Sequence, residues 1–186
     1  GLYMTGLLLD GERKSIEPMA ARLVDSANEV EAMRQRLQQC VAVSPWAASE
    51  MFGRIGRRLD RELPQVEAFV VDDTGFPKKG KHSVGVARQY SGTLGRVDNC
   101  QVATSLHLAS EFGSGCIGMR LYLPESWTSD PARCRKAGVP DDAEFAPKWK
   151  NALSLIDEAL AAGVRKHVVL GDSAFGDVTE FREGLT

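Results

Sequence analysis

The chain has 186 residues, of which 43% are hydrophobic and 26% are charged. This length allows one sizeable core, or one domain with a helical appendage. No apolar run approaches the roughly 18 residues that cross a bilayer, which excludes a membrane span, and the N-terminal GLYMTGLLLD is too short and too soon acidic for a secretory signal. The formal net charge of -2 gives no overall attraction for nucleic acid, so DNA contacts would have to come from local basic clusters.

The four cysteines lie far apart and form no C-x-x-C pair. Their spacing argues against a zinc site and for reduced, intracellular thiols, so we expect a cytoplasmic protein. The chain opens on Gly1 rather than Met and stops at Thr186 within a helical pattern, which suggests a fragment of a longer protein.

Residues 1–64 are predicted to form a helical region. One helix is expected over 14–24, with Ser15 as N-cap and Pro18 in the first turn, and another over 30–43. After a break at 44–46, a third helix with a basic face is expected over 47–63. Such a region could bind DNA, but the pattern favours a packed bundle with a solvated basic face.

From residue 65 the hydrophobic period changes and predicts a second domain over 65–186. Strands are expected over 67–72, 99–109 and 117–123, followed by a long polar loop over 124–146. A helix then begins at Pro147 and ends at Gly163, a buried strand covers 167–170, and a further helix starts near Asp177. This order predicts antiparallel neighbours followed by a helical crossover, so that the last strand runs parallel to the first.

Two aspartate motifs end the first and last of these strands, VVDDT and VVLGDS. If the two strands are neighbours, Asp172 and one carboxylate of the Asp72–Asp73 pair meet at the same end of the sheet. Carboxylate oxygens are ligands that Mg²⁺ prefers. An aspartate at a strand end also commonly makes a turn or caps a helix, and the repetition of the motif is what favours a site.

Residues 75–81 also spell G-x-x-x-x-G-K, the beginning of a phosphate-binding P-loop. His82 stands where that motif requires Ser or Thr, and the following SVGVARQY is typical of a strand or loop rather than a helix. A P-loop nucleotide hydrolase is therefore the weaker hypothesis.

The segments VVDDTGFPKKGKHSVGVARQYSGTLGRVDNCQVATSLHLAS, VVLGDSAFGD and GLLLDGERKSIEPMAARL closely resemble transposases of bacterial insertion sequences, in the branch called the seven-zero-one family of the DDE superfamily. The resemblance covers essentially the whole chain. It implies an α/β fold, a ribonuclease-H-like mixed sheet with flanking helices, preceded by an N-terminal helical region. It also implies a triad of two aspartates and a glutamate that binds two Mg²⁺ or Mn²⁺ ions.

Carried over to this sequence, the second acid of the triad is Asp172 and the first is Asp72 or Asp73. Successive side chains of a strand point to opposite faces, so only one of the pair should enter the site. Related transposases show Asp-x-Ser/Thr here, which favours Asp72 and leaves Asp73 a turn or supporting role. The third acid departs from the pattern: Glu180 and Glu183 follow Asp172 too closely, and a solvated helix face explains them better. The catalytic domain is therefore expected to stop before its third acid.

The basic residues after the first strand are candidates for gripping DNA phosphates; they are Lys78, Lys79, Lys81, His82 and Arg88. A solvated lysine-rich turn is the alternative. The resemblance implies a transposase that cleaves transposon ends and joins them to target DNA, acts as a homo-oligomer on terminal repeats, and associates with the nucleoid when bound. The alternative is a truncated, inactive remnant that only binds DNA.

Overall fold

The structure is a computed structural model that describes residues 1–186, with every side chain except that of Thr93. The chain divides into two compact units, Gly1–Ala47 and Ala48–Thr186. The sequence predicted a boundary at 64/65, but the third helix, α4, packs on the sheet and belongs to the second unit. Among the described helices, none has the length and apolar character needed to cross a membrane.

Unit 1 is helical, with α1 over Leu2–Leu8, α2 over Ile16–Arg22, a 3-10 turn over Ala27–Glu29 and α3 over Val30–Ala42. Its core is formed by Met19, Ala20, Met33 and Leu37. The helices expected over 14–24 and 30–43 are confirmed as α2 and α3, and Ser15 is the N-cap residue of α2. The helix α1 was not predicted, because seven residues provide too short a periodic pattern.

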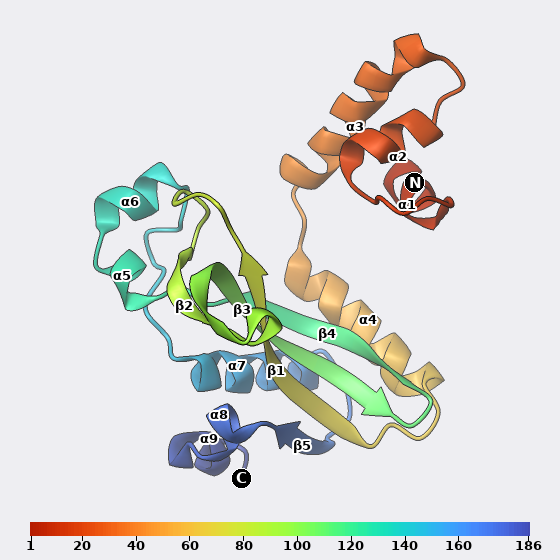
Figure 1. Cartoon of the computed structure of the whole chain (residues 1–186). Helices are drawn as coiled ribbons and strands as arrows, with labels where there is room; N and C mark the ends of the chain where they lie inside the picture. The colour runs from red at the N-terminus through yellow and green to blue at the C-terminus, as the bar shows by residue number, and fades with distance from the viewer. The chain divides into compact units, whose positions relative to one another are not determined.

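Unit 2 is a mixed five-stranded sheet with flanking helices (Figure 1). Its elements are α4 (Ala48–Glu62), β1 (Ala68–Pro77), β2 (Ala87–Ser91), a 3-10 turn (Gly92–Leu94), β3 (Arg96–Ser110), β4 (Gly113–Leu121), α5 (Glu125–Thr128), α6 (Pro131–Lys136), α7 (Lys148–Ala161), β5 (Val168–Gly171), α8 (Ser173–Gly176) and α9 (Thr179–Gly184). The long strand β3 pairs antiparallel with β1, β2 and β4, and β5 pairs parallel with β1. The expected antiparallel neighbours and the helical crossover to a parallel strand are therefore confirmed.

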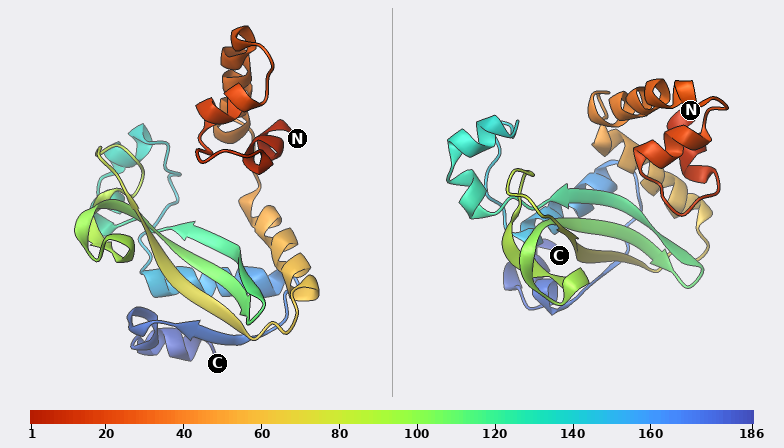
Figure 2. Two further views of the ribbon diagram at one scale, coloured as in Figure 1. Left: turned by 45° about the vertical axis from the view of Figure 1, so that its right-hand side comes forward. Right: turned by 45° about the horizontal axis from the view of Figure 1, so that its top comes forward.

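The main core lies between the sheet and α7 (Figure 2). Phe69 and Val71 of β1 and Leu106 and Leu108 of β3 are almost completely buried against this helix. Burial of such side chains contributes about 1.5–3 kcal/mol each, and the alternation of a strand then directs the intervening residues to the other face. On that other face Val168 and Leu170 are 67% and 52% exposed, so the sheet is covered by helices on one side only within the described chain.

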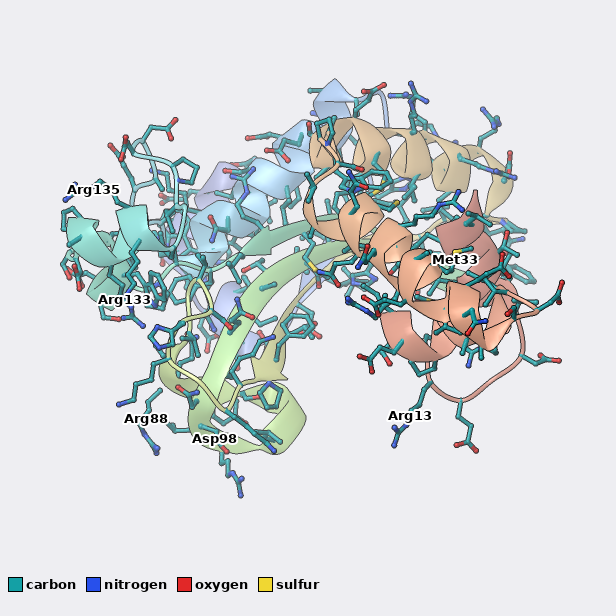
Figure 3. The ribbon with its side chains drawn as sticks, turned by 90° about the horizontal axis from the view of Figure 1, so that it is seen from above. Arg13, Met33, Arg88, Asp98, Arg133 and Arg135 are labelled. Carbon is teal, nitrogen blue, oxygen red and sulfur yellow. The ribbon has the colours of Figure 1, made fainter. Side chains whose placement is uncertain are left out.

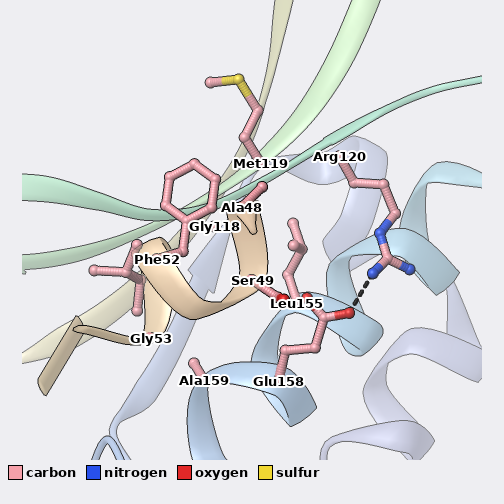
Figure 4. Close-up of a pocket in the computed structure, with 11 residues that line it drawn as sticks. Ala48, Ser49, Phe52, Gly53, Gly118, Met119, Arg120, Leu155, Glu158 and Ala159 are labelled. Atoms are coloured by element: carbon pink, nitrogen blue, oxygen red, sulfur yellow. Dashed lines mark hydrogen bonds and ion pairs between the residues drawn. The ribbon is translucent and has the colours of Figure 1, made fainter. Parts of the chain in front are cut away.

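The helix α4 approaches the C-terminal end of α7 and the segment after it closely, because glycines replace side chains at the contact. A Cβ atom on Gly56 would lie 2.9 Å from Cγ2 of Val164, and one on Gly53 would lie 3.0 Å from Cβ of Ala162. At the N-terminal end of α4, a cavity of about 180 Å³ remains between α4, β4 and α7, flanked by the ion pair of Arg120 and Glu158 (Figure 4). The cavity is a consequence of this packing and lies apart from the carboxylates described below.

One expectation for unit 2 needs correction, and two other segments become defined. The segment 124–146 is not a plain loop, because it contains α5 and α6, which are too short to show a period. The helix expected near Asp177 is confirmed as α9, which begins at Thr179, and the short helix α8, which begins at Ser173, precedes it. The strand β2 forms an additional pair with β3 within a segment that the sequence left open between strand and loop.

Candidate active site

Asp72 lies in the middle of β1, beside the point where β5 ends, and Asp172 follows directly after β5. In the parallel register Ala68 pairs with Val168, and the last pair is Val71 with Gly171. Asp72 and Asp172 are therefore the next residue of each of the two neighbouring segments. Neighbouring strands are about 4.8 Å apart. Asp72 and Asp172 are both exposed to solvent, as a site for a large polyanionic substrate requires.

Each of these carboxylates is oriented by one backbone amide. Oδ1 of Asp72 accepts a hydrogen bond from the amide of Asp73 at 2.7 Å, and Oδ1 of Asp172 accepts one from the amide of Ala174 at 3.0 Å. Asp172 is thereby the N-cap of α8, as expected of an aspartate at a strand end. Within the described residues no hydrogen bond or ion pair engages Oδ2 of either side chain, which leaves one oxygen of each free to bind a cation.

Asp73 lies on the opposite face of β1 from Asp72, and both oxygens of its carboxylate have partners within the protein. Its side chain is 19% exposed, and its Oδ2 pairs with Nζ of Lys148 at 2.7 Å. The hydroxyl of Thr104, its cross-strand neighbour, donates to its Oδ1 at 3.0 Å. Asp73 therefore connects β1 to β3 and to the first turn of α7. No pattern in the sequence marks Lys148, and only the packing of α7 on the sheet brings it to this aspartate.

The donor set fits a hard divalent cation in kind but is incomplete in number. Asp72 and Asp172 supply carboxylate oxygens, the ligands that Mg²⁺ and Mn²⁺ prefer. Glu180 and Glu183 are exposed on α9, and across the described part of the chain no three acidic, histidine or cysteine side chains converge as a metal site would require. Two carboxylates, rather than the three of the expected triad, are therefore available here.

The loop over residues 78–86 follows β1 and carries the predicted DNA-binding lysines. Two amide side chains of β3 hold its backbone: Asn99 donates to the carbonyls of Lys78 and Gly80 at 2.6 and 3.0 Å, and Gln101 donates to the carbonyl of Val84 at 2.6 Å. Lys79, Lys81 and His82 are exposed, whereas Lys78 is half-buried.

Arg88 is exposed on β2, near the carboxylate of Asp98 (Figure 3). The backbone amide of Asn99 and the side chain of Arg96 lower the pKa of this carboxyl, with Arg88 adding a smaller effect. The Arg96–Asp98 ion pair, at 2.9 Å, places a negative charge beside Arg88 and makes it a weaker candidate for a phosphate contact than the loop lysines.

The other signals in the sequence have structural explanations. Gly75 lies inside β1 and a turn followed by β2 comes after Lys81, so the segment lacks the helix that a P-loop needs. His167 is a core histidine whose Nε2 lies 2.8 Å from Oδ1 of Asp60. The basic residues of α4 pair mainly with acids of the same helix, as Arg54 does with Glu50, which agrees with a solvated face.

Comparison with known proteins agrees with this arrangement. A family model described as DDE superfamily endonuclease matches residues 1–186. Over 176 residues, 92% of this chain, the sequence is 29% identical to a protein of Microchaete diplosiphon described as "Probable transposase for insertion sequence element IS701". The chain spans about two fifths of that relative, since the match covers 41% of its length.

No solved structure matches the chain. The family model supports the resemblance stated from the sequence, and the mixed sheet with flanking helices is consistent with the ribonuclease-H-like fold expected of it. The chain belongs to the DDE superfamily of endonucleases.

Proposed function

We propose that the chain carries part of the active site of a DDE transposase that cleaves DNA at the ends of an insertion sequence and joins them to target DNA. The observation that supports this most directly is the parallel register of β1 and β5, which places Asp72 and Asp172 side by side. Family membership supplies the reaction class. The substrates would be the terminal repeats of the element and its target DNA, bound by a homo-oligomer in the bacterial cytoplasm and at the nucleoid.

In this proposal Asp72 and Asp172 hold the divalent metal, Mg²⁺ or Mn²⁺, through Oδ2, the carboxylate oxygen of each that accepts no hydrogen bond from the described residues. Such ions, when bound, activate the attacking oxygen and stabilise the leaving oxygen of a phosphodiester. A third carboxylate would come from a segment outside residues 1–186. The reaction replaces the P–O3′ bond with a bond to the oxygen of water, whose proton goes to the released 3′-oxygen. The resulting 3′-hydroxyl then attacks a phosphodiester of the target, where a new P–O bond forms as the P–O3′ bond of the target breaks and the target's 3′-hydroxyl leaves.

Asp73 has a supporting role in the proposed site. Its carboxylate is held by Lys148 and Thr104, and its backbone amide donates to Asp72. Asp73 therefore fixes the main chain at the point where the metal-binding side chain leaves the strand. Supporting residues of this kind orient the ligands of a metal site without touching the metal.

The proposal is tested first by metal binding to the 186-residue chain. We expect Mn²⁺ to bind weakly in calorimetric titration, because only two carboxylates converge, and we expect Asp172→Asn to abolish the binding. Asp177→Asn is the matched control, since this exposed aspartate lies five residues further along the same segment. Equal Mn²⁺ binding by wild type and Asp172→Asn would refute the assignment.

A DNA cleavage assay then separates the enzyme from the alternative, an inactive remnant that only binds DNA. The substrate is DNA that carries the terminal repeats of the element, and the 186-residue chain is compared with a longer protein extended along its natural reading frame. We expect the extended protein to nick the DNA with Mg²⁺ or Mn²⁺ and the 186-residue chain to remain inactive. Inactivity of both would favour the remnant.

A further inference from the structure

The short helices α5 and α6 place a second set of basic side chains beside the lysines of loop 78–86. The last turn of α6 contains Arg133, Arg135 and Lys136. A cavity of about 200 Å³ is lined by Lys81 and His82 from the loop together with Trp127, Arg133 and Lys136 from the helices. Residues separated by about fifty positions in the sequence therefore share one surface.

Trp127 and Arg133 hold the two segments together. Trp127 is 1% exposed, and its Nε1 donates to the carbonyl of Val86 at 2.9 Å. The guanidinium of Arg133 lies 3.7 Å from the centre of the Trp127 ring and donates to the carbonyl of Lys81 at 3.0 Å. A stacked arginine of this kind is an anchor rather than a free cation.

The remaining basic side chains point to solvent and have no acidic partner among the described ion pairs. We call this set the cationic surface; its members are Lys79, Lys81, His82, Arg135 and Lys136. Figure 3 shows Arg133 and Arg135 on the same side of unit 2 as Arg88. Asp130 directly precedes α6 and is the N-cap of this helix, because its side chain accepts a hydrogen bond from the backbone amide of Arg133.

The exposed basic side chains of the cationic surface suit a polyanion with regularly spaced charges, because hydrogen bonds hold the backbone of loop 78–86 in place. The chain as a whole has a net charge of -2, so its overall field does not attract DNA and this local concentration of positive charge would have to do so. Phosphate contacts by Lys and Arg release counterions and need no base recognition. The absence of paired acids keeps these side chains available for such contacts.

We infer that the cationic surface binds the phosphate backbone of duplex DNA, with Arg135 and Lys136 of α6 as contacts and with Trp127 and Arg133 as positioning residues. This inference rests on the proposed function and identifies where the DNA lies. Asp72 and Pro77 are five positions apart in β1, about 17 Å at 3.3 Å per residue, and loop 78–86 begins directly after Pro77.

The test measures binding of a 30-base-pair duplex by fluorescence anisotropy in EDTA, over a series of KCl concentrations. We expect Arg135→Ala with Lys136→Ala to lower affinity about five- to tenfold per lost contact at 0.1 M salt and to reduce the slope of log K against log [salt] by about 2. The charge-retaining pair Arg135→Lys with Lys136→Arg should bind as wild type does.

The matched control is Arg58→Ala with Lys166→Ala, which removes two exposed positive charges from other parts of unit 2. Equal affinity and slope for the α6 pair and for this control would overturn the inference, as would failure of the wild-type chain to bind the duplex at 50 mM KCl. Neither result bears on the aspartates, because the Mn²⁺ titration of Asp172→Asn measures a different quantity and tests the proposed function separately.

Discussion

Asp60 ties α4 to the beginning of β5, and Asp60→Asn is expected to weaken this tie. The carboxylate is 7% exposed and accepts hydrogen bonds from the backbone amide and the Nε of Arg165, both at 3.0 Å. It also lies 2.8 Å from Nε2 of His167, whose ring packs edge-on against Phe69. Asparagine has the same shape but lacks the charge, and its amide would face these donors.

The size of the effect follows from the pKa of Asp60. Burial alone would raise this pKa, but the hydrogen bonds from Arg165 and His167 outweigh it and lower the pKa from 3.8 to about 2. At about 1.4 kcal/mol per pKa unit, the native contacts of the ionised form stabilise the fold by about 2 kcal/mol. Because the folded pKa is the lower one, this contribution is complete above the unfolded pKa of 3.8 and is lost as the pH falls toward 2.

Thermal unfolding at a series of pH values tests this reasoning. At pH 7 we expect Asp60→Asn to lower Tm by about 4–8 °C, since about 1 kcal/mol shifts Tm by 2–4 °C in a chain of this size. Between pH 4 and 2 the variant should lose less stability than the wild type. Glu50→Gln is the control on the same helix, because its exposed pair with Arg54 should contribute below about 1 kcal/mol. Identical Tm values for wild type and Asp60→Asn across this range would refute the argument.

Three further predictions test the packing and the site. Gly56→Ala should lower the free energy of unfolding by up to about 2 kcal/mol in urea titration, because the added Cβ would lie 2.9 Å from Cγ2 of Val164 and overpacking outweighs the gain in helix propensity; increased stability would contradict the close approach. Asp73→Asn should reduce cleavage by the extended protein about 10- to 100-fold while Asp72→Asn abolishes it, and the reverse order would show that the wrong face was assigned. Trp127→Phe should cost about 1 kcal/mol in thermal unfolding, because the carbonyl of Val86 loses its indole donor and keeps only the longer hydrogen bond from Arg133 at 3.4 Å, and an unchanged Tm would show that the indole bond contributes nothing.

Local patterns in the sequence predicted much of the fold. Alternation of apolar residues identified β3 and β4, three- and four-residue spacing identified α3 and α7, and the order of elements predicted that β5 runs parallel to β1. These predictions succeed because one buried face imposes a period on the sequence. The repeated apolar-to-aspartate motif also predicted that Asp172 lies beside the Asp72–Asp73 pair, since the parallel register follows from the crossover connection, while the choice of Asp72 came from the family resemblance.

Contacts between distant segments were decided only by the tertiary structure. No local pattern connects Lys148 to Asp73, Asp60 to His167, or Arg133 to Trp127, because each pair depends on how a helix packs rather than on whether it forms. For the same reason α4 was predicted to belong with the N-terminal helices, although it packs against β4 and glycines on its inner face let it approach the end of α7. The sequence by itself determined which strands carry the carboxylates, and the packing of helices determined which side chains support them and where the basic residues gather.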